Sequence, residues 1–153
     1  SAWSRGAAWA IYGLALSYRH TKDPEFLDGA KRAASYFLAN LPEDYVAHWD
    51  FRVARNADTP RDTSAASCTA CGLLEIAKHV PEHEKHLYIT AALKTIQAVE
   101  KKFADWSDET DFIIGGASGS YKDSEHRHMY FIYTDYYFAE AIYKLLNLGD
   151  LSW

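Results

Sequence analysis

Uncharged and amphipathic helical segments alternate along this chain, and this alternation limits its possible folds more than any other feature. Residues 7–17 and 64–74 contain no charged side chain and fall inside helices expected over about 5–20 and 62–78. A helix that is uncharged on all sides is typically buried on all sides. The sequence therefore predicts two helices in the interior of the molecule.

Two other expected helices, over about 24–40 and 82–104, are amphipathic. Their apolar residues recur at spacings of three and four and lie on one face, with charged residues elsewhere. Asp23 and Pro24 begin the first of them, because aspartate is a good N-cap and proline suits the first helical position. We expect both helices in an outer layer, and a fifth helix over about 134–148.

Hairpins of one inner and one outer helix are the arrangement that this alternation favours. Gly13-Leu14 in the first inner helix matches Gly72-Leu73 in the second, which is a faint internal repeat. Repeated helical hairpins build α/α toroids or solenoids, and an irregular bundle is the alternative. The sequence predicts an all-α fold, an α/α toroid of helical hairpins.

The connections between these helices differ in length with their direction. Connections from an inner to an outer helix are short, whereas those from an outer to an inner helix, about 41–61 and 105–133, are long. Such long loops in a compact domain are usually functional. Both must lie where the inner helices begin, so we expect them to converge with residues 3–9 on one mouth. Residues 112–121 are expected to form a short strand and turn.

Composition excludes several classes of protein. The 153 residues suffice for one domain with a sizeable core, and 15% of them are aromatic, which suggests a surface that stacks flat ligands. The net charge of −5 argues against a nucleic-acid partner, and no apolar run is long enough for a membrane span. No secretory signal is visible, but the chain begins at Ser1 without Met, so the compartment is left unknown, with the cytoplasm favoured.

Cysteine and histidine residues give no metal site. Cys68 and Cys71 lie one helical turn apart and, without further ligands nearby, are expected to be buried thiols. His126 and His128 are open to a sugar contact or a structural role, because no third metal ligand is evident. Three more histidines are expected at the solvated surface: His79, His83 and His86.

Asp50 and Asp62 are the carboxylates expected nearest the mouth. A typical glycosidase needs two carboxylates at a defined separation. Asp62 follows Pro60-Arg61 at the start of a helix, where an N-cap is the favoured role. Asp50, between Trp49 and Phe51, either braces its loop or binds a sugar hydroxyl.

Arg5 and Trp9 are the sharpest functional signal in the sequence, because they lie four residues apart on one helix face. A guanidinium at the mouth suits a carboxylate or sulfate, and an indole ring suits a sugar face. The alternative is an Arg-on-Trp packing contact.

Four segments together resemble the unsaturated glucuronyl hydrolases, glycoside hydrolase family 88. Residues 3–13, WSRGAAWAIYG, are similar to that family's W-[SA]-R-G-Q-x-W-x-x-Y-G, and residues 48–51, HWDF, to its Y-W-D-F. Residues 60–66, PRDTSAA, resemble P-R-D-x-S-A-A, and residues 133–141, YTDYYFAEA, resemble Y-x-D-Y-Y-x-x-E-A. The four motifs occur in order and cover nearly the whole chain.

The resemblance implies an (α/α)6 barrel of which residues 1–153 are the C-terminal portion. The family's catalytic aspartates belong to the preceding part, since none of Asp50, Asp62 and Asp135 matches them. The chain alone is therefore expected to be an inactive part of an enzyme. Exposed apolar edges of a partial barrel suggest that it associates with the missing N-terminal half or with itself.

The implied activity is hydrolysis of an oligosaccharide that carries a 4,5-unsaturated uronic acid at its non-reducing end, without a cofactor. By motif, Arg5 and Trp9 contact this substrate, while Ser4, Trp49 and Asp50 help to shape the pocket. Metal is not expected.

Two departures from the family pattern bear on substrate preference. Ala7 stands where the family usually has Gln, and Gly116 where it often has His. A related hydrolase of unsaturated rhamnogalacturonan products is therefore an option. Other options are a non-enzymatic carbohydrate-binding or interaction module and a metal-dependent α/α-toroid enzyme such as a cyclase.

Overall fold

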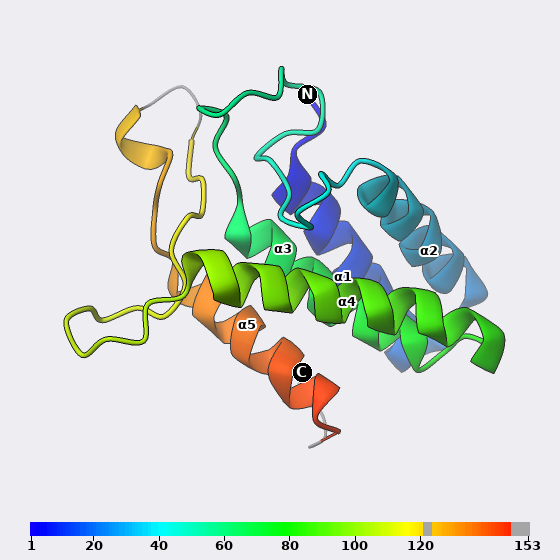
Figure 1. The fold of residues 1–153 in the computed structure, drawn as a ribbon. Coiled ribbons are helices and arrows are strands. Elements are labelled where there is room, and N and C mark those ends of the chain that lie inside the picture. Colours follow the sequence, from blue (N-terminus) through cyan, green and yellow to red (C-terminus); the bar gives the residue numbers. More distant parts are fainter. Residues whose placement is uncertain (121–123, 148–153) are drawn as a thin grey trace.

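The computed structural model describes residues 1–120 and 124–147, and these form five α-helices and one short 3-10 helix (Figure 1). The elements are α1 (Ser4–Thr21), α2 (Pro24–Ala39), α3 (Thr63–Ala77), α4 (Glu82–Phe103), η1 (Ser124–His126) and α5 (Ile132–Leu145). Every expected helix is present, with ends within one turn of prediction; Leu148, the expected end of the fifth, lies outside the described residues. The all-α prediction is confirmed.

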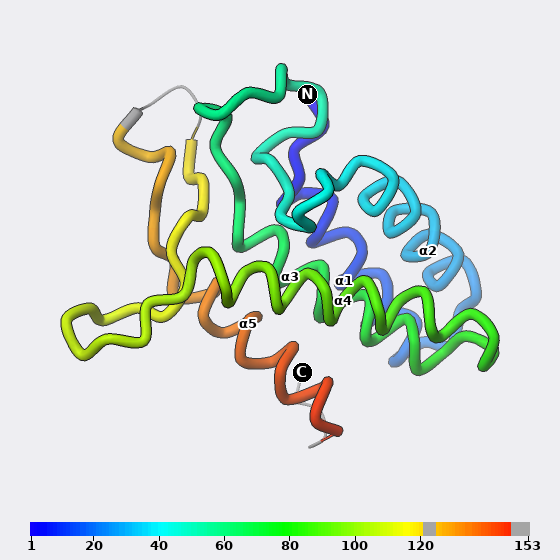
Figure 2. Tube along the Cα trace, viewed as in Figure 1, coloured from blue at the N-terminus to red at the C-terminus, as the bar shows by residue number. Residues whose placement is uncertain are grey.

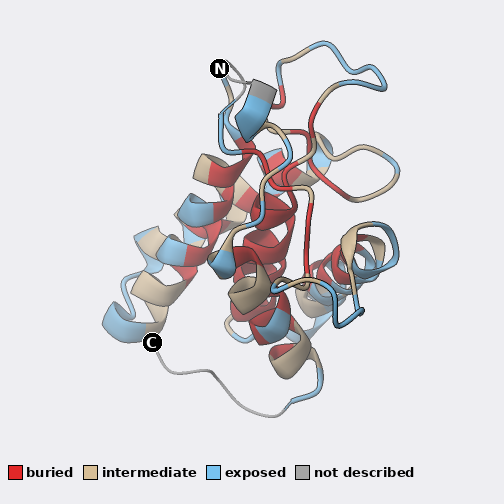
Figure 3. Ribbon diagram, turned by 90° about the vertical axis from the view of Figure 1, so that its left-hand side faces the viewer, coloured by how far each residue is buried: buried red, intermediate tan, exposed pale blue. Residues whose placement is uncertain are grey.

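Helix α3 lies in the middle of the molecule. It contacts α1 and α5, which complete an inner layer, and α2 and α4, which form the outer layer. Neighbours therefore cover it on every side, and all 15 of its residues are buried. Figure 3 shows buried residues concentrated on the central helices. The prediction made from the uncharged run at 64–74 is confirmed.

Helix α1 differs from its prediction. Trp9, Ala10 and Gly13 are exposed, so the expectation that this helix is buried on all sides is wrong. The helix packs on α2 and α3 and meets α5 through side chains, and the described residues leave the face of Trp9 and Gly13 uncovered.

Two aspartates begin their helices as predicted. Asp23 accepts a hydrogen bond from the Glu25 amide at 3.0 Å and caps α2. Asp62 accepts from the amides of Ser64 and Ala65 and caps α3. Together the hairpins α1–α2 and α3–α4 and the helix α5 form part of an α/α toroid.

The described parts of the long loops contain isolated β-bridges instead of strands. Among the described residues, the strand expected within 112–121 is reduced to single bridges at Ile114 and Ala117. The reason is that helix residues take the backbone groups that a ladder needs: Asp135 binds the amides of residues 113–114, and Thr63 binds the Gly115 carbonyl. Across the described ranges, no helix combines the length and apolarity that a membrane span requires.

Candidate functional site

The mouth is the end of the molecule at which α1, α3 and α5 begin, together with loops 40–62 and 104–131. Figure 2 shows both loops at this end. Hydrogen bonds connect each inner helix to a loop. They run from Ser4 N to Trp49 O (3.0 Å), from Thr63 N to Gly116 O (3.3 Å), and from Ile113 N and Ile114 N to the Asp135 carboxylate (3.1 and 2.7 Å). The predicted convergence on one mouth is confirmed.

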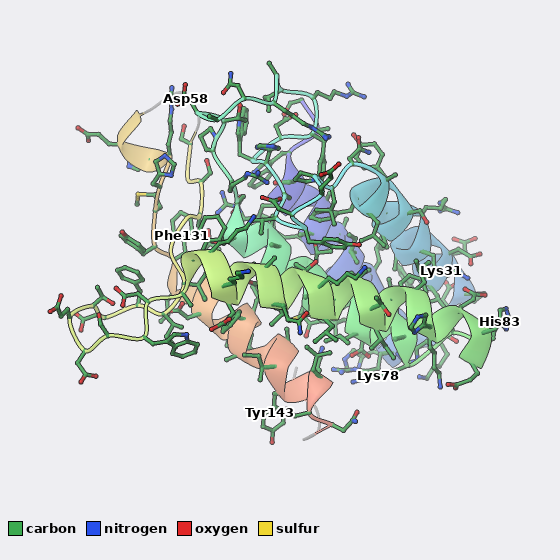
Figure 4. The ribbon with its side chains drawn as sticks, in the orientation of Figure 1. Lys31, Asp58, Lys78, His83, Phe131 and Tyr143 are labelled. Atoms are coloured by element: carbon green, nitrogen blue, oxygen red, sulfur yellow. The ribbon has the colours of Figure 1, made fainter. Side chains whose placement is uncertain are left out.

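Four aromatic rings surround the Arg5 guanidinium at the mouth and form what we call the Arg5 cage: Trp3, Trp9, Phe131 and Tyr133. The guanidinium carbon lies 5.2 to 5.9 Å from each ring centroid, within the range of cation–π attraction. Two of the rings, Trp3 and Trp9, meet edge to face, and the other two are stacked. The packing contact between Arg5 and Trp9 that the sequence left open is present. In Figure 4 Phe131 lies at the mouth, and Lys78 and His83 lie at the opposite end.

Three groups bind the nitrogens of Arg5, whose side chain is almost fully buried. Nη1 donates to the Tyr133 hydroxyl, and Nη2 donates to the Ser118 carbonyl oxygen at 2.6 Å. Nε lies 3.6 Å from Asp62 Oδ2. Only 4% of Arg5 is exposed, so its charge lies in the wall of the mouth and not on an open surface.

An aromatic pocket of about 370 Å³ begins beside the Arg5 cage, and the two share Trp9. Its lining is Trp9, Tyr12, Gly13, Leu16, Cys68 and Tyr137. Trp9 is 46% exposed, and the rings of Tyr12 and Tyr137 meet edge to face at 6.0 Å. The volume suits one or two sugar rings, and apolar lining with few polar groups is typical of ligand pockets.

A buried charged network lies behind this pocket and joins all three inner helices. The Tyr12 hydroxyl donates to Glu140 and accepts from Lys144 Nζ at 3.0 Å. The same Nζ lies 3.2 Å from Glu140 and 3.5 Å from Glu75. Burial raises the pKa of Tyr12, and Glu140 raises it further, so the hydroxyl stays protonated. The network fixes one wall of the pocket.

Glu75 contacts three more basic side chains at the end of the molecule away from the mouth. Lys78 Nζ, His79 Nε2 and Arg19 Nη1 lie 3.2, 3.1 and 3.5 Å from its carboxylate. Burial alone raises a carboxyl pKa, but Lys144 and these neighbours hold the pKa of Glu75 below its usual value. His79 is therefore bonded and half-buried, not solvated as predicted.

The other predicted pocket residues sit around the mouth with most polar atoms engaged. Ser4 is buried and its hydroxyl donates to the Trp49 carbonyl at 3.0 Å. Asp50 is 2% exposed; its Oδ2 accepts from the Ser1 hydroxyl and the Ala2 amide at 2.5 and 2.8 Å. Despite burial, these bonds lower the pKa of Asp50. The carboxylate braces the loop, which is one of its two expected roles.

His48 lies in the same loop, next to the segment that leads into α3. It is buried, and its bridge partner is Arg61. Burial lowers the pKa of His48, and the charges of Arg61 and Arg55 lower it further. The imidazole is therefore neutral in the folded protein near neutral pH.

The two departures from the family pattern have different surroundings. Gly116 has φ +74°, and a Cβ there would lie 2.4 Å from the Phe103 ring, so a histidine does not fit this backbone. Ala7 is half-buried and packs against the core.

Sequence reasoning missed much of the site. Tyr133 lay in a quoted motif but was not singled out, and its ring packs under Arg5. Tyr12 and Glu140 likewise fell inside quoted motifs. Glu75, directly after the uncharged run 64–74, is a sequence feature that could have indicated a buried charged network.

The cysteines and remaining histidines lie as follows. Cys68 and Cys71 are buried thiols in α3, as predicted. His83, His86, His126 and His128 are exposed. In the described ranges no three His, Cys, Asp or Glu side chains gather as metal ligands.

Comparison with known proteins gives matches to one group of enzymes. An unsaturated glucuronyl hydrolase of Bacillus sp. strain GL1 is 41% identical over 148 residues, which is 95% of this chain and 39% of that protein. An unsaturated chondroitin disaccharide hydrolase of Streptococcus pneumoniae is 33% identical over 160 residues, 100% of this chain and 39% of that protein. No protein-family model matches the sequence.

Solved structures agree. The crystal structure of the Bacillus enzyme has a TM-score of 0.89 over 94% of this chain and 39% of that chain. A variant unsaturated glucuronyl hydrolase of Streptococcus agalactiae, solved with dGlcA-GalNAc6S, has a TM-score of 0.90 at 32% identity, over 99% and 41% of the two chains.

The fold and the mouth define part of an α/α toroid with a pocket that runs along its inner helices next to the mouth. Over almost its whole length this chain is a homologue of the unsaturated glucuronyl hydrolases, and it spans about two fifths of the length of the relatives it matches. These matches do not favour a non-enzymatic module.

Proposed function

We propose that this chain forms the C-terminal part of a single (α/α)6 barrel in a glycoside hydrolase of the unsaturated glucuronyl hydrolase type. The whole enzyme removes the 4,5-unsaturated uronic acid unit from the non-reducing end of oligosaccharides that a polysaccharide lyase has made. The observation that carries the proposal is the Arg5 cage beside an aromatic pocket. A buried cation and stacking rings at one mouth suit an acidic sugar.

We assign ligand binding to the remaining hydrogens of the Arg5 guanidinium and to the ring of Trp9. Each terminal nitrogen of a guanidinium carries two hydrogens, so Arg5 retains donors for a carboxylate beside its bonds to Tyr133 and Ser118. Trp9 offers an exposed ring face for stacking. The net charge of −5 does not oppose an acidic ligand, because a nearby cation outweighs distant screened charges.

The proposed reaction is hydration of the C4=C5 double bond. A proton adds to C4 and the hydroxyl of water adds to C5, and the resulting hemiketal collapses and releases the sugar. We assign the proton donor to the part of the whole protein that precedes this chain. The acidic side chains at this mouth support that assignment, since Asp62 pairs with Arg5 and Asp50 braces its loop.

Loss of the ultraviolet absorbance of an unsaturated chondroitin disaccharide tests the proposal. The whole protein should consume the absorbance, and the 153-residue chain alone should not. In the whole protein, Trp9→Ala should lower kcat/KM about tenfold or more, with Trp106→Ala, an exposed ring outside the pocket, as the matched control. An inactive whole protein would refute the activity, and turnover by the chain alone would refute the location of the acid.

A further inference from the structure

The two carboxylate oxygens of Asp62 have separate surroundings. Oδ1 accepts from the amides of Ser64 and Ala65 at 3.2 and 3.3 Å and from the Ser64 hydroxyl at 2.5 Å. Oδ2 takes no part in capping α3 and makes no hydrogen bond in the described part of the chain. One oxygen therefore holds the helix, and the other is left for a different partner.

That partner is Arg5. Asp62 Oδ2 lies 3.6 Å from Arg5 Nε, which is the one buried Arg5 nitrogen without a hydrogen bond among the described residues. Asp62 is fully buried and Arg5 nearly so. A buried charge is costly unless it is paired, so each group needs the other.

Three contacts on three nitrogens determine the plane of a guanidinium. Tyr133, at the start of α5, and Ser118, in the preceding loop, bind the two terminal nitrogens of Arg5. Asp62 supplies the third contact, from α3. The plane of Arg5 in turn contacts the rings of Trp3 and Trp9.

We propose that Asp62 is a positioning residue: through Oδ2 it orients the Arg5 guanidinium in its cage, apart from its capping of α3 through Oδ1. Burial raises the pKa of Asp62, and Arg5, the Ser64 hydroxyl and the backbone of Ala65 and Ser118 oppose the rise. The orientation of Arg5 stands on the geometry alone. Its consequence for ligand binding rests on the proposed function.

Substitutions can separate the two roles, because asparagine and serine are also good N-caps. Asp62→Asn and Asp62→Ser should keep α3 capped while removing the charge that faces Arg5. Asp23→Asn is the matched control: Asp23 caps α2 in the same way, through the Glu25 amide, at an exposed position away from the cage.

The first readout is solvent exchange of the Arg5 Nε–H, measured by nitrogen-15 NMR on this chain and assigned by its absence in Arg5→Lys. Exchange should accelerate at least about tenfold in both Asp62 variants and stay unchanged in Asp23→Asn. Unchanged exchange in the Asp62 variants, or equal acceleration in Asp23→Asn, would overturn the inference. If the Asp62 variants do not fold, the Asp62 carboxyl carbon shift in Arg5→Gln replaces them: it should move while the Ser64 and Ala65 amides do not, and an unmoved shift overturns the inference.

The second readout is hydrolysis of the unsaturated chondroitin disaccharide by the whole protein. Asp62→Asn should raise KM about tenfold with a smaller change in kcat, whereas Asp23→Asn should leave both unchanged. A normal KM together with accelerated Nε–H exchange would overturn the binding consequence. An inactive wild type with accelerated exchange would refute the proposed function and leave the positioning role standing.

Discussion

Helices α1 and α3 share an uncharged run and a Gly-Leu pair but have different surroundings. Both contain long uncharged runs, and both were predicted to be buried on all sides. Helix α3 is buried at every residue because four helices surround it, whereas α1 exposes Trp9 and Gly13 on the face that lines the aromatic pocket. Local composition thus indicates that a helix is compatible with the interior, but its neighbours decide how much of it is covered.

Gly13 in α1 and Gly72 in α3, which match in the sequence repeat, differ in the space available to a Cβ atom. A Cβ on Gly72 would lie 2.8 Å from Ile11 Cγ2 and 3.0 Å from the Tyr12 amide nitrogen, so α1 and α3 approach closely there. A Cβ on Gly13 would meet nothing within 4 Å. The repeat seen in the sequence therefore serves packing in one copy only.

The largest expected effect comes from the charge that α3 buries. Glu75→Gln removes the buried charge that faces Lys144, Lys78 and Arg19 and leaves Lys144 with Glu140. Breaking a buried pair of this kind costs about 3–5 kcal/mol of unfolding free energy. Glu84→Gln is the control, because Glu84 pairs with Lys31 at the surface, where such pairs are worth about 0–1 kcal/mol. Urea denaturation followed by circular dichroism measures both. Equal losses would mean that burial does not distinguish the two pairs.

Replacing Gly72 or Gly13 by alanine should change the free energy of unfolding in opposite directions. Gly72→Ala should destabilise the chain by about 1–3 kcal/mol, because the helices must separate to admit a methyl group. Gly13→Ala should stabilise it by about 0.5–1 kcal/mol, because alanine favours the helix and nothing obstructs it. Thermal unfolding of the two variants gives both signs, and a common sign would contradict the contrast between α1 and α3.

The smallest effect concerns the loop that joins the starts of the two helices. His48 is adjacent to Trp49, which binds Ser4 of α1, and its bridge partner Arg61 precedes Asp62 of α3. The pKa of His48 is lowered on folding from 6.5, so the unfolded chain binds the proton more readily. Its contribution to stability is complete above pH 6.5 and is lost as pH falls through the folded-state pKa.

His48→Tyr, the residue of the family motif, should therefore flatten the decline in urea midpoint between pH 7 and pH 5. Exposed His83→Gln should leave that decline unchanged. An identical decline in wild type and His48→Tyr would show that another group titrates in this range.

Periodicity and capping predicted the helices well because both are local properties. Asp23, Pro24 and Asp62 mark helix starts within a few residues of their bonding partners. The partners of Arg5 were harder to predict. The sequence placed Arg5 on one helix face with Trp9, but Tyr133, which binds it, lies 128 positions away. The same distance separates Tyr12 from Glu140. Pairings of this range depend on how the helices assemble, which no local pattern contains.

The bonds that hold loop 104–131 have a consequence for engineering. Asp135 and Thr63 secure residues 113–116, and Ala117 pairs with Met129 through backbone groups. Among its described residues, the stretch between Ala117 and Met129 contributes to Arg5 only the backbone carbonyl of Ser118, which any amino acid supplies. The length and side chains of this stretch can therefore be varied between the bonds that hold its two ends. Libraries of such variants should change the ligand specificity of the mouth without disturbing the helical fold.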